Sequence, residues 1–370
     1  MKTRAHANPS PCLADILTPE ANSFGVLRFL LATLVLISHS YLYCAGTSEA
    51  EPLVGWLGRS LGECAVQVFF ILSGVMVAQS FDRSRSVVDF AVARILRIFP
   101  ALIVCVLITS FLIGPIVSRL APADYLTNPG LYGYLAKTLT LSTGSASLPG
   151  VFETVPYAGY VNSSLWTLKY EVLCYVGLAL LGFVGLFQPR WRWPALTGLA
   201  FLVATVSLSL PSNPDAFVFL DNLRYFAVFF GTGVLAYLVR KDLRINALVL
   251  VPLFALFVVT VRTPFAEVGA ALFLAYAALC AATLTWGPLR ALCNRFDTSF
   301  GIYIGAGPIQ QTLLWLIPTL TPIWLSLLAF AIVFPIAFLS WIGLEKPALR
   351  LRRSVVDLLK KRLPAVALPG

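Results

Sequence analysis

The sequence has few charged residues. Asp, Glu, Lys and Arg account for 12% of its 370 residues, whereas hydrophobic residues account for 58%. Because a soluble domain carries about a quarter charged residues, this composition excludes an ordinary soluble fold and predicts a protein that crosses a membrane several times. The formal net charge of +10 is typical of basic loops on the cytoplasmic side. It does not predict nucleic-acid binding, because no soluble basic domain is present.

Metal-binding patterns are also missing. The chain has two histidines and seven cysteines, with no CxxC pair and no Cys/His cluster at the spacing of metal ligands. We therefore expect no metal. Cys44 and Cys64 flank one loop, where they are either free thiols or a disulfide that faces an oxidising compartment.

Apolar segments of about 20 residues, long enough to cross a bilayer, follow one another along the chain. We predict an all-α polytopic membrane protein, a single bundle of about ten helices without an internal repeat. The predicted spans are 24–43, 64–81, 100–118, 166–187, 194–211, 217–239, 246–262, 265–286, 299–317 and 322–343. They form a membrane domain at 24–345, between a tail at 1–23 that lacks the apolar core of a signal peptide and a basic tail at 346–370.

The distribution of Lys and Arg predicts the orientation. Most of the 27 Lys and Arg residues occur in one set of alternate loops, and such residues collect on the cytoplasmic side. We expect both termini to be cytoplasmic, and the tail at 346–370 to lie on the anionic inner leaflet.

The first span carries two groups that are costly inside a membrane, Arg28 and His39. Charged groups at the centre of a span cost roughly 2.5–3.5 kcal/mol and usually mark function. A helix places these two residues about 16 Å apart along its axis and within roughly 20° of one face. This spacing predicts a path into the membrane, with Arg28 near the cytoplasmic end and His39 near the outer end.

His39 is the candidate catalytic base. An imidazole titrates near neutral pH and can take a proton from a reacting group, and the other histidine, His6, lies in a polar tail. The alternative is a structural histidine that is hydrogen-bonded to a neighbouring helix.

Arg94 and Arg97 occur in the run ARILRIFP, which we expect to follow the second span just before Pro100 starts the third. At a spacing of three they share one helical face, and guanidinium groups bind phosphates bidentately. They are candidates for holding a phosphate-bearing donor from the cytosol. The alternatives are ordinary positive-inside charge and binding of lipid headgroups.

Glu171 lies at the outer start of the span at 166–187. A carboxylate that enters a membrane helix is usually paired, and we expect its partner among His39, Lys169 and Arg224. Glu171 then either assists catalysis by orienting the imidazole or belongs to a structural ion pair.

Trp166 and Arg224 are the candidates for binding an acceptor. Trp166 is otherwise an interfacial anchor, and Arg224 otherwise pairs with Asp221, three residues before it. Glu345, at the end of the last span, is expected to neutralise an inner arginine.

Six short motifs occur in order along the chain. They are the Arg-x10-His pair of Arg28 and His39, FFILSG (69–74), RILRIFP (94–100), SLWTLKYE (164–171), DTSFGIYI (297–304) and EKP (345–347). On these motifs the sequence resembles the membrane acyltransferase-3 family, over roughly residues 24–347. Members of that family O-acylate surface polysaccharides, lipopolysaccharide, Nod factors and related glycans.

The resemblance implies a multi-pass protein of the bacterial cytoplasmic (inner) membrane that takes acetyl-CoA or another acyl-CoA from the cytoplasm. The acceptor would be a sugar hydroxyl of a glycan or lipid-linked oligosaccharide. His39 would be the catalytic residue with Glu171 assisting, and Arg28, Arg94 and Arg97 would contact the coenzyme. Many members have a histidine after the SxxLYL-like motif, where this sequence has Gly305-Ala306-Gly307-Pro308, so no second base is implied there.

Two other functions use the same residues. Arg28, His39 and Glu171 could form a proton or substrate relay in a transporter, although the hydropathy shows no inverted repeat. The chain could also be a non-catalytic component of polysaccharide export, which would neither bind nor consume acyl-CoA.

Overall fold

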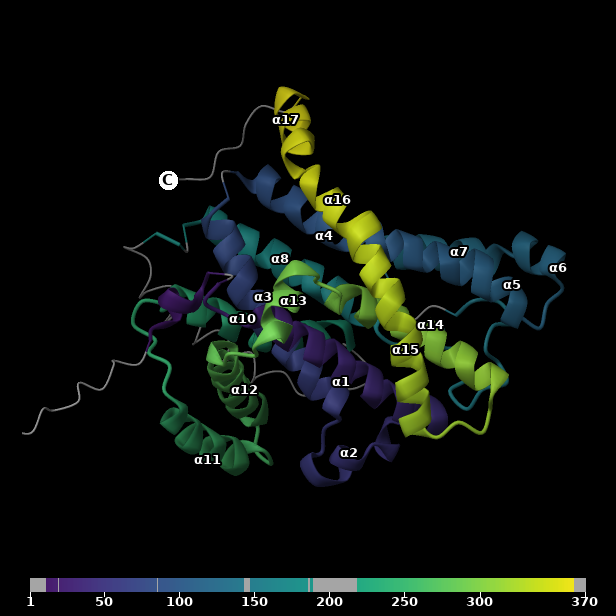
Figure 1. Cartoon of the computed structure of the whole chain (residues 1–370), viewed down its shortest axis with the longest axis horizontal. Coiled ribbons are helices and arrows are strands. Elements are labelled where there is room, and N and C mark those ends of the chain that lie inside the picture. Colours follow the sequence, from purple (N-terminus) through teal and green to yellow (C-terminus); the bar gives the residue numbers. More distant parts are fainter. Residues whose placement is uncertain are drawn as a thin grey trace, which may run out of the picture.

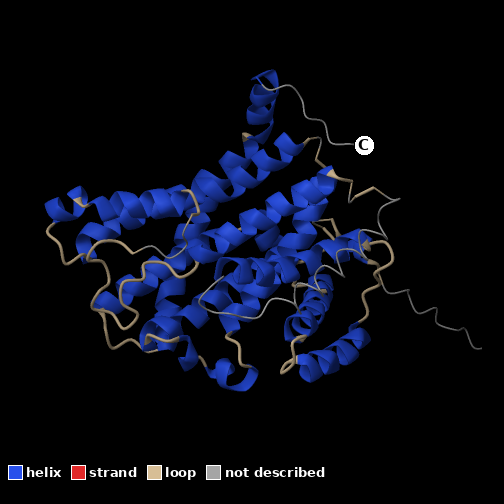
Figure 2. Cartoon of the chain, turned by 180° about the vertical axis from the view of Figure 1, so that it is seen from behind, coloured by secondary structure: helices blue, strands red, loops and turns tan. Residues whose placement is uncertain are grey.

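The computed structural model describes residues 11–18, 20–84, 86–142, 147–185, 187–188 and 218–362. Within these ranges the chain is helical and contains no β-strand, as Figure 2 shows, so the all-α prediction is confirmed. Seven helical segments among the described residues are long and apolar enough to cross a membrane. The protein is therefore a multi-pass membrane protein.

The helices vary in length from single turns to several turns (Figure 1). Their bounds are α1 Phe24–Ala45, α2 Pro52–Leu57, α3 Leu61–Asp82, α4 Val87–Ile108, α5 Gly114–Val117, α6 Pro122–Thr127, α7 Pro129–Leu139, α8 Leu168–Phe183, α10 Val218–Leu238, α11 Leu250–Thr260, α12 Ala266–Thr283, α13 Pro288–Arg295, α14 Ser299–Leu316, α15 Pro322–Ser340, α16 Lys346–Arg350 and α17 Arg352–Arg362. Two π-helical turns, Thr109–Ile113 and Trp341–Glu345, follow α4 and α15. A 3-10 turn at Leu165–Thr167 leads directly into α8.

Most predicted spans coincide with helices, and one boundary was wrong. The third span does not start at Pro100, because α4 begins at Val87 and contains the proline in its interior. The side chain of Ser86 caps this earlier start by accepting a hydrogen bond from Asp89 N at 3.2 Å. The predicted span at 194–211 lies outside the described residues, and the one at 246–262 contains α11, an 11-residue helix.

Helix α14 continues through Pro308 because another group satisfies the carbonyl that the proline leaves free. Proline has no N–H to donate to the carbonyl four residues before it, which here belongs to Ile304. That oxygen accepts from Asn162 Nδ2 at 2.7 Å and from Cys105 Sγ at 3.3 Å. The loop before α8 is thereby attached to the middle of α14.

The centre of the bundle is packed through small residues, which allow helices to approach closely. Gly74 of α3 faces α10 so closely that an added Cβ would lie 2.1 Å from Phe230 O, and one on Gly233 would lie 2.0 Å from Ile71 O. Neighbouring Ser73 points to α8, where its hydroxyl lies 3.1 Å from the Tyr175 hydroxyl. Helix α1 packs against α3 and α14.

The last described part of the chain extends α15. Through the π turn it continues into α16 and α17, and α17 packs on α4 at one end of the molecule, opposite α2 (Figure 1). Arg352 Nε donates to Asp89 Oδ1 at 2.8 Å, which joins α17 to the start of α4.

Candidate active site

Two cavities lie along α1. The arginine cavity, about 400 Å³, is lined by Arg28, Arg94, Arg97 and Arg352 among others, and the histidine cavity, about 380 Å³, is lined by His39. The prediction that Arg28 and His39 share an inward face is confirmed. Three residues line both cavities: Val66, Thr167 and Tyr303. The cavities therefore meet at this shared wall.

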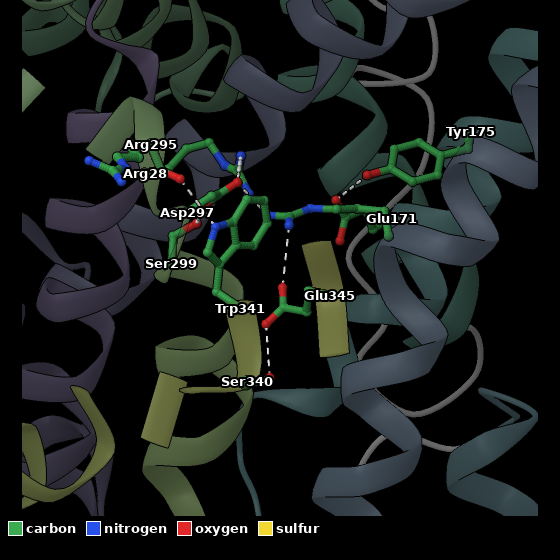
Figure 3. A network of polar contacts seen from close by, with 10 residues as sticks. Arg28, Glu171, Tyr175, Arg295, Asp297, Ser299, Ser340, Trp341 and Glu345 are labelled. Carbon is green, nitrogen blue, oxygen red and sulfur yellow. Dashed lines mark hydrogen bonds and ion pairs between the residues drawn. The ribbon is translucent and has the colours of Figure 1, made fainter. Parts of the chain in front are cut away.

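Asp297 forms ion pairs with two arginines that line the arginine cavity (Figure 3). Its Oδ2 accepts from Arg28 Nη1 and from Arg97 Nη2, both at 2.7 Å, and its Oδ1 accepts from Ser299 at 2.6 Å. Arg97 Nη1 also lies 3.3 Å from Glu345 Oε2, which confirms that Glu345 neutralises an inner arginine. Burial alone would raise the pKa of Asp297, but Arg28 and Arg97 outweigh it and hold that pKa well below its usual range.

Arg94 differs from Arg97, although the two lie one helical turn apart. Among the described residues Arg94 has no carboxylate within ion-pair distance. Its Nη2 donates to Ser80 Oγ at 3.3 Å, and its guanidinium lies about 5.9 Å from the Phe90 ring and 5.8 Å from the Tyr175 ring. Its Nε is buried without a hydrogen-bond partner. Among the described residues, Arg94 is thus the one arginine of this cavity that no carboxylate at ion-pair distance neutralises.

Glu171 is not where the sequence predicted it, because it lines the arginine cavity rather than the histidine cavity. Its carboxylate accepts from Tyr175 OH one turn later and from Ser73 Oγ at 3.4 Å. The expected pairing with His39, Lys169 or Arg224 was therefore wrong. The helix α8 begins only after the turn at Leu165–Thr167, and this geometry directs Glu171 toward α3 and its local hydroxyl groups.

His39 is half-buried and faces the histidine cavity rather than lipid. Its Nδ1 lies 3.5 Å from Ser164 Oγ, and its ring lies 5.7 Å from the Tyr43 ring. In the tautomer that carries its proton on Nδ1, the ring donates to Ser164 Oγ and Nε2 is the acceptor nitrogen. The ring can therefore act as a base toward the cavity.

The segment at 162–167 connects the histidine to the shared wall. Asn162 is anchored on α14 as described above, and Ser163 N donates to Tyr43 OH at 3.0 Å. Ser164 approaches His39, and Thr167 Oγ1 lies 2.7 Å from Tyr303 OH. One short segment thus positions the base on α1 relative to α14.

Trp166 and Arg224 have different positions. Trp166 lines the histidine cavity and packs against Phe226, with 5.4 Å between ring centroids. Arg224 is absent from the described lining of both cavities. It lies 3.0 Å from Asp221 and also binds Glu267, at 2.9 Å through Nη2. The prediction that Arg224 binds an acceptor is not supported by this position, and its alternative pairing with Asp221 is confirmed.

Cys44 and Cys64 are free thiols, so the alternative disulfide is not formed. Cys44 Sγ instead lies 3.3 Å from Leu320 O. Within the described part of the chain, no three His, Cys, Asp or Glu side chains are grouped as metal ligands.

Sequence reasoning assigned no role to Asp297, Thr167 or Tyr303. All three lie inside quoted motifs, DTSFGIYI and SLWTLKYE, so a signal was present. Their roles depend on partners from distant parts of the chain, which a motif read alone cannot supply.

Comparison with known proteins identifies the family of the chain. Residues 22–342 match the model of the acyltransferase-3 family, described as an acyltransferase domain. The chain is 29% identical over 309 residues, 80% of this chain and 86% of the relative, to an O-acetyl transferase of Shigella phage Sf6. It is 27% identical over 367 residues, 90% of this chain and 95% of the relative, to Nodulation protein 10 of Rhizobium leguminosarum bv. viciae. No solved structure matches the chain. The chain therefore belongs to the acyltransferase-3 family and is a membrane acyltransferase.

Proposed function

We propose that this protein transfers an acyl group, in the simplest case acetyl, from cytoplasmic acyl-CoA to a sugar hydroxyl of an exported or cell-surface glycan. The observation that carries the proposal is the pair of cavities that meet at one wall, with arginines on one side and a histidine on the other. The name of the phage relative, O-acetyl transferase, supports transfer of acetyl to oxygen. A transporter is disfavoured by the family match.

The arginine cavity suits the donor. Coenzyme A carries phosphates, and guanidinium groups bind phosphate oxygens bidentately. Arg28 and Arg97 are neutralised by Asp297 and Glu345, whereas Arg94 keeps unsatisfied hydrogen-bonding capacity. Arg94 is therefore the principal phosphate contact in this proposal. Arg28 and Arg97 line the cavity beside it and are fixed by their ion pairs.

The histidine cavity suits a sugar. Polar side chains that can bind hydroxyl groups line it, and Trp166 adds an aromatic surface. The polar lining includes Ser38, Ser48, Glu51, Ser60, Glu63, Ser163, Asp221, Asn222 and Tyr225.

In this mechanism His39 acts as the general base. Its Nε2 takes the proton of the attacking sugar hydroxyl as the oxygen bonds to the thioester carbonyl carbon. The carbon–sulfur bond then breaks, and the released coenzyme A thiolate takes up the proton from the imidazolium. Ser164 keeps the ring oriented through Nδ1. The position of Glu171 supports a role beside Arg94 at the donor, rather than contact with the base.

The test is the substitution His39→Ala. Membranes that contain the wild-type protein are given acetyl-CoA and the native glycan, and ester formation on the glycan is measured by mass spectrometry. We expect His39→Ala to abolish ester formation at unchanged membrane abundance. The matched control is His6→Ala, at the other histidine, which should retain wild-type activity. An active His39→Ala protein would refute the proposal.

We also infer that the protein lies in the bacterial cytoplasmic membrane with both termini in the cytoplasm. The inference is supported by the Lys and Arg distribution in the sequence. A reporter enzyme that is active only in the cytoplasm, fused after residue 370, should be active. An inactive cytoplasmic reporter paired with an active periplasmic one would reverse the orientation and place Arg94 on the wrong side for acyl-CoA.

A further inference from the structure

In the described part of the chain, the wall between the cavities is where a donor in one cavity can meet an acceptor in the other. Of the three residues that line both cavities, Val66 is apolar, and Thr167 and Tyr303 each carry a hydroxyl. The Tyr303 ring is held edge-on against Phe69, with 5.7 Å between centroids. Its hydroxyl is therefore kept at the wall by packing, independently of its hydrogen bond.

The hydrogen bonds at the wall identify which hydroxyl is the donor. Thr167 Oγ1 donates its single proton to Ser164 O at 3.1 Å. Thr167 therefore accepts in its 2.7 Å contact with Tyr303, and the phenol hydroxyl donates. A phenol proton can rotate about its C–O bond to reach a better acceptor, so Tyr303 can redirect this hydrogen bond to a ligand that enters the wall.

We propose that Tyr303 is a further catalytic residue, the hydrogen-bond donor to the thioester carbonyl oxygen during transfer; this proposal rests on the proposed function. As the sugar oxygen bonds to the carbonyl carbon, His39 takes the hydroxyl proton and the carbonyl oxygen becomes negatively charged. Tyr303 donates to that oxygen. When the carbonyl double bond re-forms, the carbon–sulfur bond breaks, and the thiolate takes the proton from the imidazolium.

The surrounding structure fixes this donor relative to the base. Ile304 follows Tyr303, and its carbonyl receives no helical hydrogen bond from Pro308. Asn162 donates a hydrogen bond to that carbonyl instead. The same segment brings Ser164 to His39. Such preorganised donors stabilise developing charge without reorganising during the reaction, and removing one costs roughly 10²–10³ in kcat.

The experiment compares Tyr303→Phe with Thr167→Val in the full-length protein, with acetyl-CoA and the native glycan as substrates. Tyr303→Phe removes the donor but keeps the ring, so kcat should fall by roughly 10²–10³ while KM for acetyl-CoA stays unchanged. Thr167→Val removes the partner of the resting hydrogen bond and leaves the phenol proton available, so it should lose less than tenfold. Tyr132→Phe, at an exposed tyrosine, is the matched control and should behave like the wild type.

Equal losses in Tyr303→Phe and Thr167→Val would show that only the resting hydrogen bond matters, and would overturn the proposal. If Tyr303→Phe does not accumulate, the replacement Tyr303→3-fluorotyrosine keeps ring and hydroxyl. Its kcat should change with the acidity of the phenol, and an unchanged kcat would overturn the assignment. If the wild type turns over and Tyr303→Phe is equally active, only the role of Tyr303 is refuted. If the wild type itself shows no turnover, the proposed function is refuted as well.

Discussion

The two cavities have similar volumes, about 400 and 380 Å³, but opposite charge. Four arginines line the arginine cavity, together with Asp297 and Glu171. The described lining of the histidine cavity contains no Lys or Arg, and its carboxylates are Glu51, Glu63 and Asp221. The proposed donor, an anionic coenzyme, would therefore be attracted to one cavity and repelled from the other. On this proposal, charge separates donor from acceptor before any contact with the reacting atoms.

Two neighbouring arginines of the arginine cavity, Arg94 and Arg97, also differ in their partners. Arg97 is fully engaged by Asp297 and Glu345, whereas Arg94 keeps a buried Nε without a partner. One residue maintains the shape of the site, and the other is available to a ligand. This difference makes the comparison of the cavities testable.

The largest effect is expected on stability, from Arg97→Met. The substitution leaves the buried carboxylate of Glu345 without its cation and removes one of the two arginines that pair with Asp297, which costs about 3–5 kcal/mol. We expect little folded protein in membranes and a clearly lower Tm in detergent. Arg94→Met, one turn away and without a carboxylate partner among the described residues, is the control and should keep most of its Tm. Equal Tm values for the two variants would contradict the division of roles.

A smaller effect, on donor binding, is expected from Arg94→Gln. Loss of a hydrogen bond to a charged group costs about 1.5–3 kcal/mol, so KM for acetyl-CoA should rise by roughly 10- to 150-fold. KM for the glycan should stay the same. Arg119→Gln, whose side chain is 62% exposed, is the matched control. A change confined to the KM for the glycan would indicate that the arginine cavity binds the acceptor, and it would contradict the proposed assignment of the donor to this cavity.

A still smaller effect is expected in the histidine cavity, from Asn222→Ala. A neutral hydrogen bond is worth about 0.5–1.5 kcal/mol, so KM for the glycan should rise by roughly 2- to 12-fold with KM for acetyl-CoA unchanged. Asn128→Ala is the control, because Asn128 caps α7 outside both cavities. An unchanged KM for the glycan would argue against this cavity as the acceptor site.

The smallest effect is expected from pH on the Asp297 network. Because the pKa of Asp297 is lowered, its stabilising contribution is fully present above the unfolded pKa of about 3.9 and is lost as pH falls through the lower folded pKa. The Tm difference between wild type and Asp297→Asn should therefore stay constant from pH 5 to pH 8. A difference that shrinks within this range would mean that Asp297 is not held ionised by Arg28 and Arg97.

The sequence predicted the parts of the site that depend on a single helix. Arg28 and His39 were placed on one inward face because helical periodicity alone determines their relative direction, and both line a cavity. One contact between distant segments was also predicted: Glu345 was expected beside an inner arginine, and it lies 3.3 Å from Arg97. The spans were found for a similar reason, since apolar length is a local property.

The start of α4 was predicted wrongly although its cap at Ser86 is local, because the helix tolerates a proline in its interior. The other errors came from contacts between distant segments. Glu171 was assigned to the wrong cavity because its partners, Ser73 and Tyr175, depend on how α8 sits against α3. Arg224 forms its second ion pair with Glu267, 43 residues away, and no local pattern predicts that pairing.

Composition and periodicity were sufficient to establish a helical membrane protein with a cation and an imidazole on one inward stripe, because both are properties of neighbouring residues. The folded bundle was needed to show that Asp297 forms ion pairs with Arg28 and Arg97, whereas Arg94 keeps a side-chain nitrogen without a hydrogen-bond partner. It was also needed to bring Thr167 against Tyr303, 136 residues later, at the wall between the cavities. Burial and long-range pairing decide which polar group is occupied and which is free, and both arise only when the helices pack.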